Sequence, residues 1–221
     1  MAQAKEEQGF SRVADPAPLG LAAFALTTFL LSGHNASFIP DGIWIGAAIF
    51  YGGLIQLLAG MWEFRNRNVF GATAFSTYGG FWLALGGFIV LINNTSSALF
   101  KAFQVNAAGT ALLTDPEKVG LHNALAWFLV AFAIFNTYML IWAFGVNLAV
   151  GCVFLALEIT EILLAIGFFL VAHGHSAYWL HAGGWAGIVT AAVAWYASAA
   201  GVVNGMSTKP VLPVGRPLWG D

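Results

Sequence analysis

The chain has 221 residues, of which 59% are hydrophobic and 8% are charged, and its formal net charge at pH 7 is −2. A soluble domain carries about 25% charged residues, so this composition excludes a water-soluble globular protein and predicts an integral membrane protein. There is no basic cluster that would bind nucleic acid, and the single cysteine, Cys152, excludes a framework of disulfides within the chain.

A short motif, which follows a polar tail at 1–14, predicts the start of the first membrane helix. Residues 15–21 read Asp-Pro-Ala-Pro-Leu-Gly-Leu, and an apolar run comes directly after them. Asp15 can accept hydrogen bonds from exposed backbone N–H groups, and Pro16 and Pro18 fall in the first turn, where a helix needs no N–H. The motif therefore predicts a helix start, and a helix N-terminus also attracts anions.

Six apolar segments are candidate membrane spans, each of which takes about 20 mostly apolar residues, and the first is short unless it extends past Gly33. They cover residues 18–32, 43–62, 70–92, 121–144, 147–172 and 179–203. The predicted fold class is all-α, a polytopic membrane protein with six transmembrane helices around a central path. We expect an N-terminal tail at 1–14, a transmembrane domain at 15–205 and a C-terminal tail at 206–221.

The basic residues predict the orientation of these segments. Of the eight Lys and Arg residues, most fall on the side that holds both chain ends. That side has Lys5, Arg12, Arg65, Arg67, Lys209 and Arg216, whereas the opposite side has Lys101 and Lys118. Cytoplasmic loops are enriched in Lys and Arg, so we expect cytoplasmic termini in a multi-pass protein of the cell membrane. The outer side would then carry one long loop, 93–120.

Three histidines on the outer side, His173, His175 and His181, are candidate metal ligands. This spacing recurs by chance, and no cysteine or carboxylate lies nearby in the sequence, so we expect no metal site and no cofactor. The chain also has no nucleotide-binding loop, nucleophile elbow or zinc-protease motif. We therefore expect a protein that is not an enzyme.

Two carboxylates, Glu158 and Glu161, lie near the middle of the fifth segment. A charge at the bilayer centre costs about 2.5–3.5 kcal/mol, and no Lys or Arg lies within a segment to pair with them. Residues three apart share a helix face. The pair is therefore a candidate proton site on a wet path, and the alternative is a hydrogen-bonded contact between helices or subunits.

Other polar residues are scattered through the segments, and singly each is more often a contact between helices than a ligand contact. The stretch 71–80 concentrates small and hydroxyl residues, including Thr73, Ser76, Thr77 and Tyr78, and Thr27 lies in the first segment. A stretch of this kind suits the polar lining of a path more than a surface that faces lipid.

Several motifs in this order resemble the acetate uptake transporter family, which includes bacterial succinate–acetate permeases and fungal acetate and ammonia-export proteins. Residues 15–21 are similar to the family's Asn-Pro-Ala-Pro-Leu-Gly-Leu signature. The resemblance continues through residues 50–53, 56–64, 70–82, 163–167, 182–184 and 212–215. It therefore spans most of the chain.

The resemblance implies uptake of acetate, and in some members succinate, by proton symport or channel-like anion flow. It implies six helices per subunit and a homohexamer in which each subunit has its own path. The family's hydrophobic constriction falls on Phe24, Tyr78 and Leu157, and a residue tied to substrate size falls on Ala194. Such an apolar ring favours a neutral acid, or an anion that briefly sheds water, over hydrated ions. The candidate polar residues of the path are Asp15, Thr27, Thr73, Ser76 and Thr77.

Two features depart from the family pattern. Asp15 replaces the signature Asn, and Glu158 and Glu161 stand where apolar or hydroxyl residues are expected. The main prediction is a transporter or channel for acetate and similar small monocarboxylates, coupled to protons. The alternatives are ammonium or ammonia transport on the same fold, because paired carboxylates suit a cation, and a membrane sensor or structural assembly that transports nothing.

Overall fold

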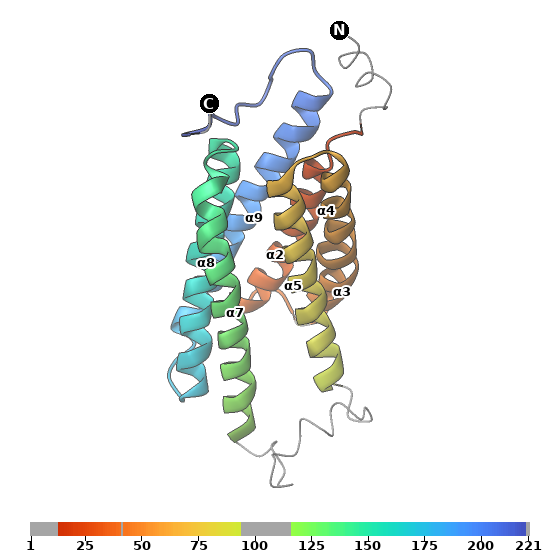
Figure 1. The fold of residues 1–221 in the computed structure, drawn as a ribbon. Helices are drawn as coiled ribbons and strands as arrows, with labels where there is room; N and C mark the ends of the chain where they lie inside the picture. Colours follow the sequence, from red (N-terminus) through yellow and green to blue (C-terminus); the bar gives the residue numbers. More distant parts are fainter. Residues whose placement is uncertain (1–12, 41, 94–115, 220–221) are drawn as a thin grey trace.

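The computed structural model describes residues 13–40, 42–93 and 116–219, and the regular structure within these ranges is helical (Figure 1). Six of its segments are long and apolar enough to span a membrane. They are α2 (Ala17–Asn35); α3 (Ile43–Ile49), η1 (Phe50–Ile55) and α4 (Gln56–Arg65), which together form the second span; α5 (Val69–Asn93); α7 (Pro116–Ala143); α8 (Leu148–Ala172); and α9 (Tyr178–Gly205). The all-α, six-span prediction is confirmed.

The helix of the fourth span extends beyond its predicted range, because α7 begins at Pro116, although its apolar span begins at Gly120, next to the predicted residue 121. Residues 116–120, predicted as part of a long loop, are helical, and the rest of that loop, 94–115, lies outside the described residues. The tail at 1–12 also lies outside them.

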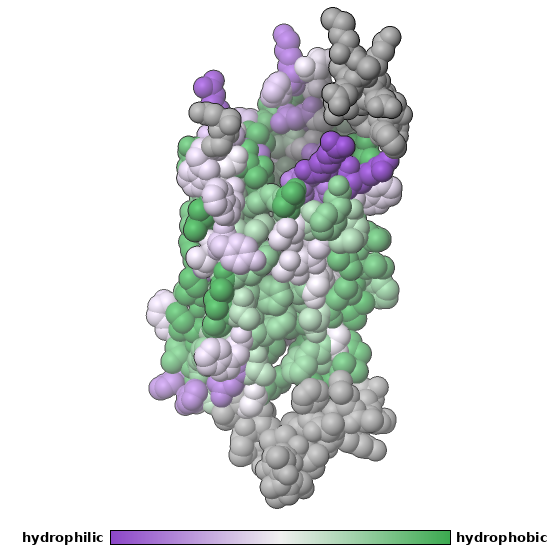
Figure 2. Space-filling view, viewed as in Figure 1, coloured by the Kyte–Doolittle hydropathy of each residue, from purple (hydrophilic) through white to green (hydrophobic). Residues whose placement is uncertain are grey.

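The described ends of the chain lie at the same end of the bundle (Figure 1). Because each span reverses the direction of the chain, α2, α5 and α8 run in one direction, and the second span, α7 and α9 run in the other. On the face seen in Figure 2, hydrophobic side chains form a broad belt, and hydrophilic ones gather toward the two ends. Such a belt buries the molecule in hydrocarbon, and the hydrophilic ends meet water.

The start of α2 is fixed by contacts on both sides of its prolines. Asp15 Oδ1 accepts a hydrogen bond of 3.0 Å from the backbone N–H of Ala17, the first residue of α2, while Pro16 holds the N-cap position. Ser198 Oγ on α9 donates a hydrogen bond of 2.6 Å to the carbonyl of Pro18. A Cβ on Gly201 would lie 2.7 Å from Pro18 Cγ, so α9 packs directly against the first turn of α2. The motif therefore sets the height of α2 in the bundle.

The second span was predicted as one helical segment at 43–62, and the structure shows a π-helical turn, η1, in its middle. The wider turn lies where α2 approaches the second span, since a Cβ on Gly52 would lie 2.6 Å from Thr27 Oγ1. Thr27 Oγ1 also reaches the carbonyl of Ala47, at 3.4 Å. The π-turn and the glycine together allow this close approach between the helices.

The C-terminal tail packs on the bundle instead of leaving it. The Asn204 side chain accepts hydrogen bonds from the backbone N–H groups of Val211 and Leu212, and it donates to the carbonyl of Leu212. The carbonyl of Val214 accepts a hydrogen bond of 2.9 Å from the N–H of Ala149. The tail therefore covers the first turn of α8 and the end of α9, in agreement with its place in Figure 1.

Two adjacent glycines of α5 give a matched test of this packing. A Cβ on Gly79 would lie 2.7 Å from the backbone nitrogen of Leu57 on α4, whereas a Cβ on Gly80 would meet no atom within 4 Å. We expect Gly79→Ala to lower the free energy of unfolding by about 1–3 kcal/mol, because the α4 backbone must shift. Gly80→Ala should be neutral or slightly stabilising. The unfolding temperature of each variant is measured in detergent from the loss of the monodisperse peak in size-exclusion chromatography. Equal midpoints for the two variants would contradict the close contact between α4 and α5.

Candidate functional site: two cavities that meet at an apolar ring

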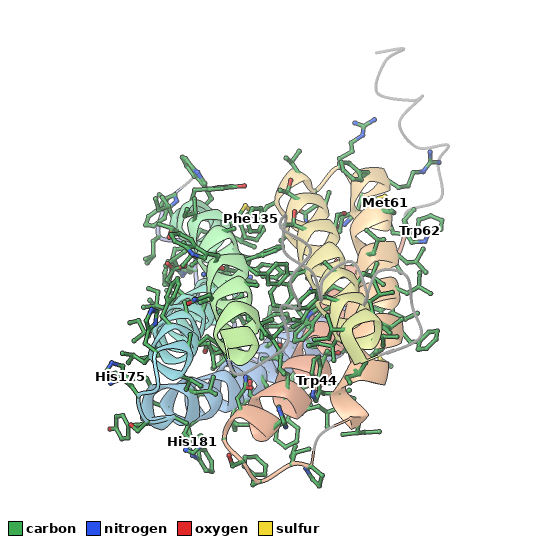
Figure 3. All side chains as sticks on the ribbon, turned by 90° about the horizontal axis from the view of Figure 1, so that it is seen from below. Trp44, Met61, Trp62, Phe135, His175 and His181 are labelled. Atoms are coloured by element: carbon green, nitrogen blue, oxygen red, sulfur yellow. The ribbon has the colours of Figure 1, made fainter. Side chains whose placement is uncertain are left out.

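The interior of the bundle contains two cavities that meet in the middle. The wide cavity has a volume of about 400 Å³ and reaches Asn35, Leu121 and Leu180, at the end of the bundle away from the described chain ends. The narrow cavity has a volume of about 70 Å³ and reaches Asn68 and Val146 at the opposite end. Figure 3 views the bundle from the wide-cavity end, where Trp44 of α3 lines the wall.

Three of the described residues line both cavities: Phe24 on α2, Tyr78 on α5 and Leu157 on α8. All three side chains are buried. The Phe24 and Tyr78 rings meet edge to face, with their centroids 5.8 Å apart. The structure thus brings together the three residues on which the predicted constriction falls, and places them where the cavities join.

The ring of Tyr78 is held by aromatic neighbours, and its hydroxyl by polar ones. Phe135 of α7 contacts the ring with centroids 5.6 Å apart, and Figure 3 shows Phe135 on the side of α7 toward α5. The hydroxyl donates a hydrogen bond of 3.0 Å to Asn136 Oδ1 and lies 3.4 Å from Glu161 Oε1. Asn136 Nδ2 donates to Glu158 Oε2 and to the carbonyl of Phe154. A polar network therefore begins at Tyr78, where the two cavities meet.

The two glutamates occupy different surroundings although they are three residues apart. Glu161 is 2% exposed and lines the wide cavity, and its Oε2 has no hydrogen-bond partner among the described residues. Glu158 is half-buried and lines neither cavity. Its oxygens are instead held by Asn136 and by Thr137 Oγ1, which lies 2.8 Å from Glu158 Oε1. Of the two, Glu161 is the carboxyl group on the cavity wall.

The other predicted site residues lie away from both cavities. This group consists of Asp15, Thr27, Thr73, Ser76, Thr77 and Ala194. Two of them lie on helix faces that point toward neighbouring helices. Thr27 faces the second span. Ser76 faces α4, where a Cβ on Gly60 would lie 2.6 Å from the Ser76 backbone nitrogen. Ala194 is fully buried in the apolar core.

Most lining residues were not among the predicted site residues, and two of them carry polar atoms that are unpaired within the described part of the chain. Thr28 and Trp82 both line the wide cavity, and each has a buried polar atom without a described hydrogen-bond partner. Each follows a constriction residue by four positions, Thr28 after Phe24 and Trp82 after Tyr78. Because residues four apart lie one above the other on a helix, this spacing was the available signal.

The outer histidines lie apart from the cavities. Figure 3 places His175 and His181 at the outer edge of the bundle, and His181 Nε2 lies 3.1 Å from Ser37 Oγ. Among the described residues, no group of three His, Cys, Asp or Glu side chains is arranged to hold a metal ion.

A bundle of six membrane spans with two cavities that meet at an apolar ring defines a membrane transporter or channel for a small solute. Comparison with known families gives the particular class. The chain belongs to the GPR1/FUN34/yaaH family, whose model matches residues 3–216. The resemblance to the acetate uptake transporters is thereby confirmed.

Three relatives of this chain have names that describe transport. Acetate permease A of Emericella nidulans is 38% identical over 94% of this chain and 68% of its own length. Succinate-acetate/proton symporter SatP of Escherichia coli is 34% identical, and the match covers 94% of this chain and 98% of that protein. Ammonia transport outward protein 2 of Saccharomyces cerevisiae is 36% identical, and the match covers 87% of this chain and 62% of that protein.

A solved structure shares the fold. The structure of the bacterial acetate channel SatP superposes with a TM-score of 0.76 at 32% sequence identity, and the match covers 92% of this chain and 99% of that one.

The hydroxyl of Tyr78 allows a test of the polar network. Tyr78→Phe keeps the ring in the constriction but leaves Asn136 Oδ1 without its donor. We expect the free energy of unfolding to fall by about 1–3 kcal/mol, the cost of a buried unsatisfied acceptor. Tyr138→Phe is the control, because Tyr138 is 48% exposed. Thermal unfolding in detergent compares the two variants; a Tyr78→Phe midpoint equal to the control would contradict the network.

Proposed function

We propose that the protein carries acetate and similar small monocarboxylates across the cell membrane together with protons. The observation that carries this proposal is the meeting of the two cavities at Phe24, Tyr78 and Leu157. The names of its relatives, an acetate permease and a succinate-acetate/proton symporter, support the substrate class. These three residues would form the constriction that a substrate passes.

The chemistry of the path suits a small carboxylic acid. Acetate has a methyl group that an apolar ring accommodates, whereas a hydrated inorganic ion would lose its water there without compensation. No Lys or Arg lies in the interior of a span: Arg65 is the last residue of α4, and Lys118 lies in the first turn of α7, before the apolar span begins at Gly120. Hydroxyl, indole and carboxyl groups, rather than a buried cation, would therefore hold the carboxylate.

Orientation and assembly complete the proposal. The distribution of Lys and Arg supports cytoplasmic termini, so the narrow cavity would face the cytoplasm and the wide cavity the outside. The family resemblance supports a homohexamer, with one path in each subunit.

Ala194 would tune the width of the path. It is fully buried in the same apolar cluster as Phe24, Tyr78 and Leu157, so a larger side chain at this position would displace its neighbours.

Ammonium or ammonia is the second candidate substrate. Two observations favour it: a buried carboxyl group, Glu161, on the wall of the wide cavity, and a yeast relative named for outward ammonia transport. A protein of this fold that senses a ligand, or forms an assembly without moving solute, is the remaining alternative.

Flux into vesicles distinguishes these functions. We expect vesicles that contain the protein to take up labelled acetate faster than protein-free vesicles, and an inward-directed proton gradient to accelerate this uptake. Unlabelled propionate should compete, succinate should compete if it shares the path, and ammonium should not. Competition by ammonium alone would favour the second candidate, and uptake equal to that of protein-free vesicles would reject transport of acetate.

Phe24 provides a test of the constriction. Phe24→Ala removes one wall of the point at which the cavities meet, so a larger acid such as butyrate should gain flux relative to acetate. The expected gain is about tenfold, which corresponds to about 1.4 kcal/mol of steric barrier. Phe29→Ala is the matched control, because Phe29 lies on the same helix, lines neither cavity and packs on Trp195. An unchanged butyrate-to-acetate ratio in Phe24→Ala would contradict the proposed constriction.

A further inference from the structure

A second ring of side chains lies one helical turn beyond the constriction. Thr28, Trp82 and Glu161 each follow a constriction residue by four positions, on α2, α5 and α8. Because these three helices run in the same direction, the three residues lie on the same side of the constriction, about 6 Å further along the helix axes. All three line the wide cavity, and none lines the narrow one.

This second ring is polar, and each of its three residues has a polar atom without a hydrogen-bond partner among the described residues. Thr28 is 5% exposed, Trp82 is 3% exposed and Glu161 is 2% exposed. Thr28 Oγ1, Trp82 Nε1 and Glu161 Oε2 each lack a hydrogen-bond partner among the described residues. A buried polar group that stays unpaired destabilises a protein by about 1–3 kcal/mol. Three such groups on one ring of a cavity wall indicate that a ligand supplies their partners.

We propose that Thr28, Trp82 and Glu161 form a binding site for the carboxyl group of the transported acid, which the site holds together with one proton. This inference rests on the proposed function and extends it to a substrate site. The indole N–H of Trp82 and the hydroxyl of Thr28 donate hydrogen bonds to the substrate's carboxylate. Glu161 and the substrate's carboxyl group share one proton through Oε2, while the methyl group lies toward Leu157.

The sharing of a proton follows from the charges around Glu161. Two carboxylates in contact in a low-dielectric site cannot both stay ionised, so one proton remains between them. The substrate brings this proton, either as the neutral acid or as the anion with a proton from the outer solution. When the substrate moves on to the apolar ring, it leaves as the neutral acid and Glu161 returns to its previous state. No bond other than the O–H bond forms or breaks.

The titratable groups that face Glu161 from neighbouring helices are compatible with this account. They are Tyr78 on α5, which lies 3.4 Å from Glu161 Oε1, and Glu158 on α8 itself. His34 on α2 and His122 on α7 line the same cavity. From α9, the packing partner is Thr190, through Thr160. None of the described lining residues is Lys or Arg, so a proton is the charge that can accompany an incoming carboxylate.

The donors also distinguish a carboxyl group from an ammonium ion. The indole N–H of Trp82 and an ammonium ion are both hydrogen-bond donors and not acceptors, so neither can pair with the other. A carboxyl group accepts from both Trp82 and Thr28 and shares a proton with Glu161, which pairs all three unpaired atoms at once.

The charge that moves with acetate tests the site. In vesicles with an imposed potassium diffusion potential, acetate uptake by the unaltered protein should follow the proton gradient and be insensitive to the potential. Glu161→Gln keeps the size of the side chain and provides an amide N–H donor in place of the carboxyl O–H, but it cannot carry a proton, so acetate should pass as an anion and its uptake should become driven by the potential. Uptake by Glu161→Gln that remains insensitive to the potential would overturn the proposal. So would a Glu158→Gln variant that alone switches to potential-driven uptake.

Acetate binding to the purified protein is an independent measurement. Thr28→Val and Trp82→Phe remove one donor each, and we expect each to weaken acetate binding by about tenfold or more. Trp127→Phe is the control, because Trp127 is 65% exposed on the outer surface and lines neither cavity. If the unaltered protein transports acetate and both ring variants bind it normally, the site is wrong while the proposed function stands. If the unaltered protein neither binds nor transports acetate, both are wrong.

Discussion

The structure depends on three helices that run in the same direction and reach the same height in the bundle. α2, α5 and α8 each place one side chain at the point where the two cavities meet, and each places another one turn later. A shift of one helix by a single residue would move its side chain off the ring by about 100° and 1.5 Å. The contact of Pro18 with Ser198 and Gly201 fixes the height of α2 and therefore matters for the path as much as for the fold.

Tyr78 connects the apolar ring to the polar groups around it. Its ring packs edge to face on Phe24, while its hydroxyl reaches Asn136 and Glu161. In hydrocarbon, water cannot satisfy such groups, so each polar atom needs a partner inside the bundle. Asn136 is the hydrogen-bond partner of both Tyr78 and Glu158. Glu161 Oε2 has no such partner among the described residues, and Glu161 lies on the wall of the wide cavity, one turn from the point at which the cavities meet.

The fold was predictable from sequence because a membrane span requires little more than length and apolar composition. The motifs around Phe24, Tyr78 and Leu157 predicted that these residues lie together, and the structure places all three where the two cavities meet. Which polar residues line the cavities was not predictable, because in a span that is apolar on all sides the sequence does not reveal which face points inward. Thr27 and Thr28 are adjacent, yet one faces the second span and the other lines the wide cavity. The π-turn η1 depends on the approach of α2, which local sequence does not encode.

The two departures from the family motifs have unequal consequences in the structure. Asp15 is exposed, lines neither cavity and accepts a hydrogen bond from the N–H of Ala17, a role that the oxygen of an asparagine also fills. Its charge lies in reach of water, where screening weakens any effect on a passing anion. Glu161 is buried on the cavity wall, one turn from the constriction, where a charge cannot be screened. Of these two residues only Glu161 lines a cavity, so a change at Glu161 alters the cavity wall, whereas a change at Asp15 leaves both cavities as they are.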